Sequence, residues 1–492
     1  MRRSGILMHI SSLPSRYGIG KLGASAYQFA DFLKKSGVSV WQILPLSPTS
    51  YGDSPYQSFS AYAGNPYFID FEQLEEQGLL EHTDYADANW GSPNKVDYER
   101  LYQMCFPILK KAFQAFDRTN PDYVAFCEKH RAWLPDYALF MALKFAHNGK
   151  AWTEWEPELA MRNAESLQKA RSKYVEDVQF FQVIQYWFYS QWDKLKTYCN
   201  ENGISLIGDM PIYVAMDSAD TWANPEIFWF DENNQPVRVA GCPPDYFSAT
   251  GQLWGNPLYD WDYLKETDYE WWFNRIAAAS KLFDILRIDH FRAFDTYYAI
   301  PYPAENAIGG DWYDGPGIEF FNMMKEKLGD LPIVAEDLGD LFDSVKELLK
   351  ETGYPGMKVL EFAFDSGEAN DYLPHNYTEN CVVYSGTHDN DTLMGWAAKA
   401  KPEDVAFARQ YCKMPEWETF NWGIIRTAYE SVANTAIIQM QDILGLGTEA
   451  RMNVPSTLGG NWVWRIDGSV LTDELADQLK EMVINSSRLE EN

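Results

Sequence analysis

Short apolar segments alternate with longer amphipathic ones along most of the chain, and this alternation most constrains what the chain can fold into. Strand-like runs separated by helical stretches are typical of βα units and a parallel sheet. We expect strands at 5–10, 40–46, 205–213, 285–291, 333–338, 357–364, 381–385 and 436–443. The last segment would also suit a helix. Eight such units predict an α/β fold, a (β/α)8 TIM barrel formed by residues 1–492 as one domain.

Two intervals between these strands are much longer than the roughly 31 residues that an ideal barrel unit needs. Residues 67–204, between the second and third strands, show helical periodicity and predict a mostly helical insertion. Residues 214–284, between the third and fourth strands, are rich in proline, glycine and tryptophan and predict an irregular insertion. Both insertions would rise from the C-terminal rim, where barrel enzymes keep their active sites.

Charge and aromatic content narrow the class of ligand. The chain has 41 Lys+Arg against 71 Asp+Glu, a formal charge of −30, which disfavours nucleic acid and anionic membranes as partners. It also contains 19 Trp, 30 Tyr and 28 Phe. Aromatic faces combined with carboxylates suit neutral sugars, which stack on rings and donate hydroxyl hydrogen bonds.

Cysteine usage and hydropathy indicate the compartment. Six cysteines are scattered without a CxxC pair, so neither a disulfide framework nor a zinc site is expected. The chain has no apolar run near 18 residues, and its N-terminal apolar segment is too short for a secretion signal. We expect a cytoplasmic protein, a monomer or homodimer, with no membrane contact.

Acidic residues follow several of the predicted strands. Asp209, Asp289 and Glu336 each end an apolar run, and Asp389 lies in the segment SGTHDNDT. Residues two apart in a strand share a face, so Arg287 should point the same way as Asp289 and keep it ionised. A lone acid at a strand end is more often a loop cap, but four at one rim favour catalysis.

Two of these acids suggest a reaction. Asp289 and Glu336 end neighbouring strands, and Glu336 shares a face with apolar Val334, which should raise its pKa. A carboxylate nucleophile beside a carboxylic acid is what a retaining glycosidase mechanism requires, and Asp389 could stabilise the developing positive charge. This pattern predicts carbohydrate chemistry but does not separate transfer from hydrolysis.

Two other motifs suggest alternative ligands. Gly18, Gly20 and Gly23 have GxGxxG spacing after a strand, but no acid ends the next strand as a dinucleotide site requires. A glycine-rich loop is the better interpretation. The HDND run at 388–391 could hold a metal, but without a third ligand nearby it favours sugar contacts.

The chain resembles a known family along nearly its whole length, from about residue 5 to 465. The segments that carry the resemblance are GILMHISSLPSRYGIG, SYGDSPYQSFSAYAGNPY, IGDMPIYVA, GCPPDYFSATGQLWGNPLYDW, LRIDHFR, VAEDLG, SGTHDNDT and RMNVPSTLGGNWVWR. They are similar to the 4-α-glucanotransferases (amylomaltases or disproportionating enzymes), glycoside hydrolase family seventy-seven of the α-amylase clan. The resemblance implies a barrel without the clan's C-terminal β-sandwich.

The resemblance also implies roles for individual residues. Asp289 would be the nucleophile, Glu336 the general acid/base and Asp389 the transition-state stabiliser. Further residues would bind the glucan: Arg287 and His388 at the sugar that reacts, Asp209, Asp365, Ser54 and Tyr56 on the donor side, and Tyr246, Phe247, Gln252 and Trp254 in or near a substrate-covering loop within 214–284. The implied partners are maltooligosaccharides and α-1,4-glucans, and the site would need no metal or other cofactor.

Three functions therefore stay open. The first is a 4-α-glucanotransferase, a hexosyltransferase that moves a glucan segment to the 4-hydroxyl of an acceptor through a covalent glycosyl-enzyme. The second is an α-1,4-glucan hydrolase with the same carboxylates. The third is a non-catalytic glucan-binding protein, which is disfavoured because every catalytic-type acid is present.

Overall fold

The computed structural model describes residues 2–244, 248–339, 341–365, 367 and 369–490. Within these residues, eight parallel strands form one sheet in the order β10-β11-β12-β1-β2-β3-β6-β9. Their bounds are β1 Arg3–Leu7, β2 Val40–Gln42, β3 Ser205–Met210, β6 Ile285–Ile288, β9 Ile333–Ala335, β10 Gly356–Val359, β11 Cys381–Tyr384 and β12 Thr435–Gln439. The sheet curves so that its two edges meet, since Ala335 N at the end of β9 donates to Pro355 O just before β10 (3.0 Å). The nearly closed α/β barrel confirms the predicted fold class.

The observed strands are shorter than the apolar segments that predict them. Each strand stops near the rim, and the chain continues as a loop whose apolar residues still pack inward. The ambiguous last segment divides into strand β12 and the short helix α17, Met440–Ile443. Hydropathy alone cannot locate the change from strand β12 to helix α17, because the residues of both elements are buried.

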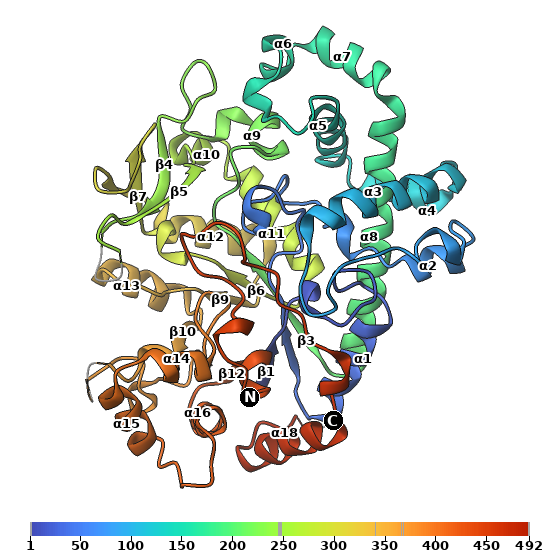
Figure 1. The fold of residues 1–492 in the computed structure, drawn as a ribbon. Coiled ribbons are helices and arrows are strands. Elements are labelled where there is room, and N and C mark those ends of the chain that lie inside the picture. Colours follow the sequence, from blue (N-terminus) through green and yellow to red (C-terminus); the bar gives the residue numbers. More distant parts are fainter. Residues whose placement is uncertain (1, 245–247, 340, 366, 368, 491–492) are drawn as a thin grey trace.

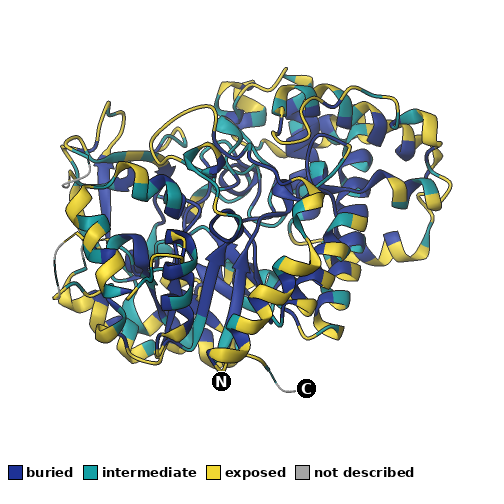
Figure 2. Cartoon of the chain, turned by 60° about the horizontal axis from the view of Figure 1, so that its bottom comes forward, coloured by how far each residue is buried: buried dark blue, intermediate teal, exposed yellow. Residues whose placement is uncertain are grey.

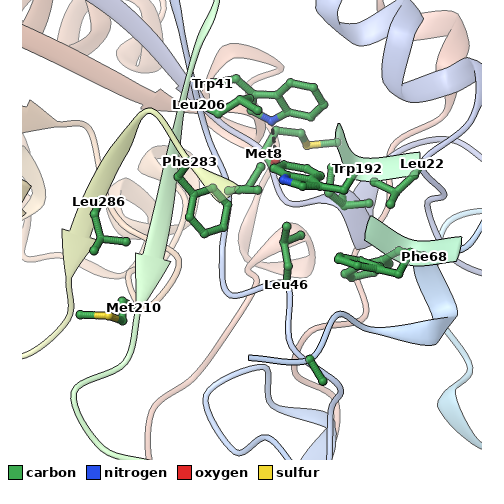
Figure 3. Close-up of a cluster of buried hydrophobic side chains, with 14 of the residues drawn as sticks. Met8, Leu22, Trp41, Leu46, Phe68, Trp192, Leu206, Met210, Phe283 and Leu286 are labelled. Atoms are coloured by element: carbon green, nitrogen blue, oxygen red, sulfur yellow. Dashed lines mark hydrogen bonds between the residues drawn. The ribbon is translucent and has the colours of Figure 1, made fainter. Parts of the chain in front are cut away.

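The barrel strands are buried on both faces, which explains their nearly continuous apolar composition (Figure 2). One face fills the barrel interior with residues such as Leu7, Ile207 and Val334. The other face packs outward against helices. Figure 3 shows this outer layer, in which Trp41 of β2 and Leu206 of β3 lie near Trp192.

The interval between β2 and β3 holds a group of helices at the right and top of Figure 1. They are α2 Phe71–Glu76, α3 Tyr98–Ala115, α4 Pro121–Lys129, α5 Leu134–Ala146, α6 Pro157–Ala160, α7 Ala164–Lys173 and α8 Val175–Glu201. Helix α8 packs along α5 and also against α1, Ala24–Lys35, on the barrel wall. It thereby joins the helical layer to the barrel.

The interval between β3 and β6 is more regular than the irregular insertion expected from the sequence. It contains β4 Arg238–Cys242 and β5 Gln252–Pro257, which pair antiparallel, and the helices α9 Ala219–Ala223, α10 Trp261–Glu266 and α11 Glu270–Leu282. Strand β4 also pairs with β7, Thr296–Pro301, and β7 pairs with β8, Asp311–Asp314, both from beyond β6. The pairing joins segments about sixty residues apart, so local sequence patterns do not reveal it.

The remaining helices cover the other side of the barrel. They are α12 Gly317–Leu328, α13 Asp343–Thr352, α14 Leu393–Lys399, α15 Pro402–Tyr411, α16 Phe420–Glu430 and α18 Asp473–Asn485. Helix α18 packs against α1 and α16 (Figure 1). Among the described residues, no helix is long and apolar enough to cross a membrane.

Candidate active site

Asp289 and Glu336 leave neighbouring strands at the same level. Strands β6 and β9 pair with Ile288 opposite Ala335, and each acid is the next residue of its chain. The ladder continues through both acids, because Asp289 N donates to Met210 O (3.1 Å) and Glu336 N donates to Ile288 O (3.0 Å). Regular strand hydrogen bonding therefore fixes the backbone of both carboxylates at the C-terminal rim.

A buried arginine ties the nucleophile candidate to the next strand. Arg287 Nη1 donates to Asp209 Oδ1 and Oδ2 (2.7 and 2.8 Å) and to Asp289 Oδ1 (3.0 Å). Arg287 lies opposite Asp209 in the β3–β6 register and shares a face with Asp289, as the strand alternation predicts. Tyr56 completes the cluster by donating its hydroxyl to Asp209 Oδ2 (2.7 Å).

The charges of this cluster do not cancel. Arg287 faces Asp209, Asp289 and Glu336, so one positive charge meets three acids among the described groups. Burial, opposed by the Arg287 guanidinium, raises the pKa of Asp289 well above its ordinary value, and the neighbouring acids raise it further. Burial also raises the pKa of Glu336, again opposed by Arg287. The two carboxyls together therefore retain a proton at a pH where isolated carboxyls are ionised.

Backbone groups hold Glu336 in place. Its Oε2 accepts from His290 N (2.6 Å) and its Oε1 from Leu338 N (3.2 Å). His290 can aim its N–H in this direction because it has a left-handed backbone, with φ of 52°. Burial lowers the pKa of the His290 ring to about 3, so the ring is neutral, and it contacts the edge of Trp254 at 4.8 Å between centroids.

In the described part of the chain, Asp389 is held by hydrogen bonds from the chain after β12, not by an ion pair with an arginine. It lies in the loop after β11, where its Oδ1 accepts from Asn453 Nδ2 (2.6 Å) and lies 3.4 Å from His388 Nε2. Arg451 donates to the backbone carbonyl of Asp389, and Asn453 N donates to His388 O (3.1 Å). The side chain of Asp389 is 47% exposed, so it is accessible to a ligand at the rim.

An aromatic stack connects the two sides. The rings of Tyr56 and His388 lie nearly parallel, 5.1 Å apart, and Trp462 flanks both at 5.8 Å. Burial lowers the pKa of His388, which keeps the ring neutral and able to donate one hydrogen bond and accept another. Tyr56 thus touches the charged cluster with its hydroxyl and the Asp389 side with its ring.

The structure places the other predicted residues as follows. Ser54 Oγ accepts from Tyr56 N (3.2 Å) and so shapes the turn that presents Tyr56. On β5, Trp254 Nε1 donates to Gln252 Oε1 (3.1 Å). Asp365 is exposed in the loop after β10, where it accepts from Asn370 (3.3 Å). Tyr246 and Phe247 lie outside the described residues.

Some supporting residues were not predicted from the sequence. Arg451 and Asn453 occur in the segment RMNVPSTLGG, but nothing in their spacing connects them with Asp389, 62 and 64 residues away. Glu361 lies two residues after the end of β10, inside the apolar segment 357–364, so a search for acids at the ends of the predicted strands does not find it. Among the residues that the structure describes, no group of three or more His, Cys, Asp or Glu side chains could hold a metal ion.

Two acids on neighbouring strands, one of them hydrogen-bonded to an arginine, are the groups that retaining glycosidases use. Together with aromatic rings at the C-terminal rim of an α/β barrel, they define the class of carbohydrate-active barrel enzymes. The comparisons specify the family. The family model for 4-alpha-glucanotransferase matches residues 8–472, and the chain belongs to this family of hexosyltransferases.

Its relatives cover nearly the whole chain. It is 51% identical to a 4-alpha-glucanotransferase of Clostridium butyricum over 96% of this chain and 98% of that one. It is 46% identical to a 4-alpha-glucanotransferase of Thermus thermophilus over 99% of each. Among solved structures it is similar to the amylomaltase of Streptococcus agalactiae in complex with acarbose, with a TM-score of 0.97, 45% identity and coverage of 99% of this chain and 100% of that one.

Proposed function

We propose that this chain transfers a segment of an α-1,4-glucan to the 4-hydroxyl of an acceptor glucan or glucose by a retaining double displacement. The observation that carries this proposal is the pair Asp289 and Glu336, which leave adjacent strands in register, with Arg287 in contact with only the first. Membership of the 4-α-glucanotransferase family supports the substrate class. A relative solved with acarbose also supports a ligand built of linked sugar units.

In the first step, an oxygen of Asp289 attacks the anomeric carbon of the donor and forms a glycosyl ester. The glycosidic bond breaks, and Glu336 gives its proton to the departing glucan oxygen. In the second step, Glu336 takes a proton from the acceptor 4-hydroxyl, whose oxygen attacks the same carbon and releases Asp289. Two inversions leave the α-linkage unchanged, and both carboxyls return to their starting states.

The contacts of Arg287 support one placement of the proton that Asp289 and Glu336 share. Arg287 donates to Asp289 Oδ1 at 3.0 Å and stabilises its anion, whereas among the described contacts the same guanidinium makes no hydrogen bond to Glu336. We therefore place the negative charge on Asp289 and the proton on Glu336 in the resting enzyme. Asp389 and His388 would hold the hydroxyls of the reacting sugar and offset the positive charge that develops on its ring.

Transfer requires that an acceptor sugar reaches the glycosyl-enzyme before water does. Trp254 contacts the ring of His290 and donates a hydrogen bond to Gln252. It supplies an apolar surface beside Glu336 on which a sugar face could stack. The family resemblance assigns Tyr246 and Phe247 to a substrate-covering loop, and we propose that these two residues favour the acceptor sugar over water. Five buried or half-buried cysteines of the described residues (Cys105, Cys127, Cys199, Cys381 and Cys412) carry free thiols. Free thiols suit a reducing compartment, so we propose that the reaction occurs in the cytoplasm.

Incubation with maltotriose tests the proposal. Transfer yields glucose together with a ladder of longer oligosaccharides, whereas glucose and maltose alone, increasing with time, would identify the hydrolase. Asp289→Asn should abolish both reactions, by a factor of at least about 10⁴. The variant should keep its unfolding temperature and bind maltooligosaccharides. Turnover by this folded variant would refute the assignment of Asp289 as nucleophile.

A further inference from the structure

The barrel closes where β9 lies beside β10 (Figure 1). These two strands are the edges of the eight-stranded sheet, and Ala335 N donates to Pro355 O (3.0 Å) across the seam between them. In a regular parallel ladder the next bond would run from Met357 N to a backbone carbonyl of β9. The Asp337 side chain takes that place, because its Oδ1 accepts from Met357 N (2.6 Å). A side chain therefore continues the hydrogen bonding of the seam at the level of the rim.

Asp337 is the residue after Glu336, and the two residues are held from opposite sides. The backbone of Glu336 is bonded to the β6 side, since its N–H donates to Ile288 O (3.0 Å) and its carbonyl accepts from Phe291 N (3.0 Å). The Asp337 side chain bonds to β10 instead. Because successive side chains of an extended chain point to opposite faces, Glu336 can face the site while Asp337 reaches the seam. The chain that carries the general acid/base candidate is thereby fixed between β6 and β10.

The turn after Glu336 adds a direct link to its carboxyl group. Leu338 N donates to Glu336 Oε1 (3.2 Å), so the peptide between residues 337 and 338 aims its N–H at this carboxyl. The orientation of that peptide depends on the backbone dihedral angles of Asp337, the residue anchored to β10. Movement of Asp337 would therefore displace both the backbone of Glu336 and a donor to its carboxyl.

The Asp337 carboxyl lies directly on the backbone of β10. Asp337 is 9% exposed, and a carboxyl this buried needs a hydrogen-bond partner, which Met357 N supplies. A Cβ placed on Gly356 would lie 2.5 Å from Asp337 Oδ2 and 2.8 Å from its Oδ1, too close for the carboxyl to stay where it is. The absence of a side chain at Gly356 is therefore what lets the carboxyl reach Met357 N.

We infer that Asp337 is a positioning residue, which fixes Glu336 at the barrel seam so that the Glu336 proton reaches the glycosidic oxygen. This inference rests on the proposed role of Glu336 as general acid/base. Asp337 acts through the backbone that it shares with Glu336, and not by contact with the sugar.

Two substitutions of similar size at Asp337 test the hydrogen bond. Asp337→Asn keeps an oxygen that accepts from Met357 N, so kcat with maltotriose should stay within about threefold of the parent value. Asp337→Leu fills a similar volume but accepts no hydrogen bond. Its kcat should fall about 10- to 100-fold, because misplacement of a catalytic group costs this much, while KM changes less than about threefold. Equal kcat values for the two variants would overturn the inference.

A donor whose leaving group needs no proton shows whether the loss passes through Glu336. α-Maltotriosyl fluoride transfers its glycosyl group to Asp289 and releases fluoride as an anion, so this step takes no proton from Glu336. Fluoride release in the first turnover of Asp337→Leu should therefore stay within about threefold of the parent rate, although maltotriose turnover falls. An equal loss with both donors would overturn the inference, because it would mean that the whole site is distorted.

Gly356→Ala tests the same contact from the β10 side. The added methyl group would occupy the space of the Asp337 carboxyl and displace it from Met357 N. We expect kcat with maltotriose to fall about threefold to tenfold while first-turnover fluoride release is unchanged. This variant keeps the inference testable if Asp337→Leu does not fold, and a parent-like kcat of folded Gly356→Ala would overturn it.

Asp284→Leu is the matched control. Asp284 also accepts a strand N–H through its side chain, from Leu206 N (2.8 Å), but it lies just before β6 at the opposite end of the barrel. Its loss should lower the unfolding temperature and leave kcat unchanged, and a kcat loss equal to that of Asp337→Leu would overturn the inference. Failure of the proposed function has a different signature, because Glu336→Gln would then retain the parent kcat with maltotriose.

Discussion

The two sides of the active site hold their carboxylates by different physical means. On the β3–β6 side, Asp289 is held by an ionic cluster in which one guanidinium bridges two aspartates. On the β11 side, the Asp389 carboxylate accepts from the Asn453 amide, and Arg451 and Asn453 N donate to the backbone carbonyls of Asp389 and His388. An ionic cluster tunes charge, whereas hydrogen bonds to a loop set position. The difference suits the roles we propose, because a nucleophile must stay ionised whereas a transition-state stabiliser must only be well placed.

Removing the ionic contacts on the β3–β6 side should have the largest effect on stability and kcat. Arg287→Met would leave Asp209 and Asp289 without their counter-ion, and removing one partner of a buried ion pair costs about 3–5 kcal/mol of stability. Because Asp289 would then hold a proton, kcat should fall at least about 10²- to 10³-fold. Thermal unfolding and maltotriose kinetics measure the two effects. A variant with parent-like values of both would show that the cluster does not control Asp289.

Breaking the hydrogen-bonded side should cost less. Asn453→Ala removes the amide that donates to Asp389 Oδ1, and a hydrogen bond to a charged group contributes about 1.5–3 kcal/mol. We expect kcat to fall about 10- to 100-fold with only a small change in unfolding temperature. Asn200→Ala is the control, because it removes the equivalent bond to Asp284 (2.7 Å), just before β6, at the opposite end of the barrel. A similar kcat loss in the control would contradict the role of Asn453.

The pH dependence of stability sharpens the comparison. The folded protein holds the protons of Glu361 and Asp442 more tightly than the unfolded chain, since burial raises both pKa values and that of Asp442 to about 7. The contribution of each group is therefore full below its unfolded pKa and is lost as pH rises through its folded pKa, by about 1.4 kcal/mol for each unit of pKa difference. For Asp442 this loss is complete near pH 7. Glu361→Gln should reduce the fall in unfolding temperature between pH 5 and pH 8. An unchanged fall would mean that Glu361 does not titrate in this range.

The smallest effect is expected at the residue that joins the two sides. Tyr56→Phe removes the hydroxyl donated to Asp209 but keeps the ring on His388, so kcat should fall only about threefold to tenfold. Tyr56→Leu removes both contacts and should cost more than Tyr56→Phe. If the two variants have the same kcat, the ring stacked on His388 makes no contribution.

Much of this arrangement could be predicted from local pattern. The eight apolar segments located the barrel strands, and acids at their ends located Asp209, Asp289 and Glu336. The alternation of side chains also placed Arg287 beside Asp289. These predictions succeed because strand period and barrel topology convert sequence position directly into a place at the rim. The roles given to these residues remain proposals.

Other features could not be predicted in this way. The four-stranded antiparallel sheet joins β4 and β5 to β7 and β8 from beyond β6, and short strands among prolines and glycines carry no distinctive local pattern. Asn453 and Asp442 contact the Asp389 loop from positions more than fifty residues away. Such contacts depend on the packing of loops that follow different strands.

The sequence by itself determined the barrel, its C-terminal rim and the carboxylates at that rim. It does so because the alternation of apolar and amphipathic segments locates the strands, and the acids stand where the apolar segments end. Only the tertiary structure decided how each carboxylate is held. The ionic cluster of Arg287, and the hydrogen bonds of Asp442 to Ser385 and Leu393 in the loop that carries Asp389, join residues from different strands and loops. Their pairing depends on register and close packing. Charge and position at this active site are therefore set by contacts that no single segment of the sequence contains.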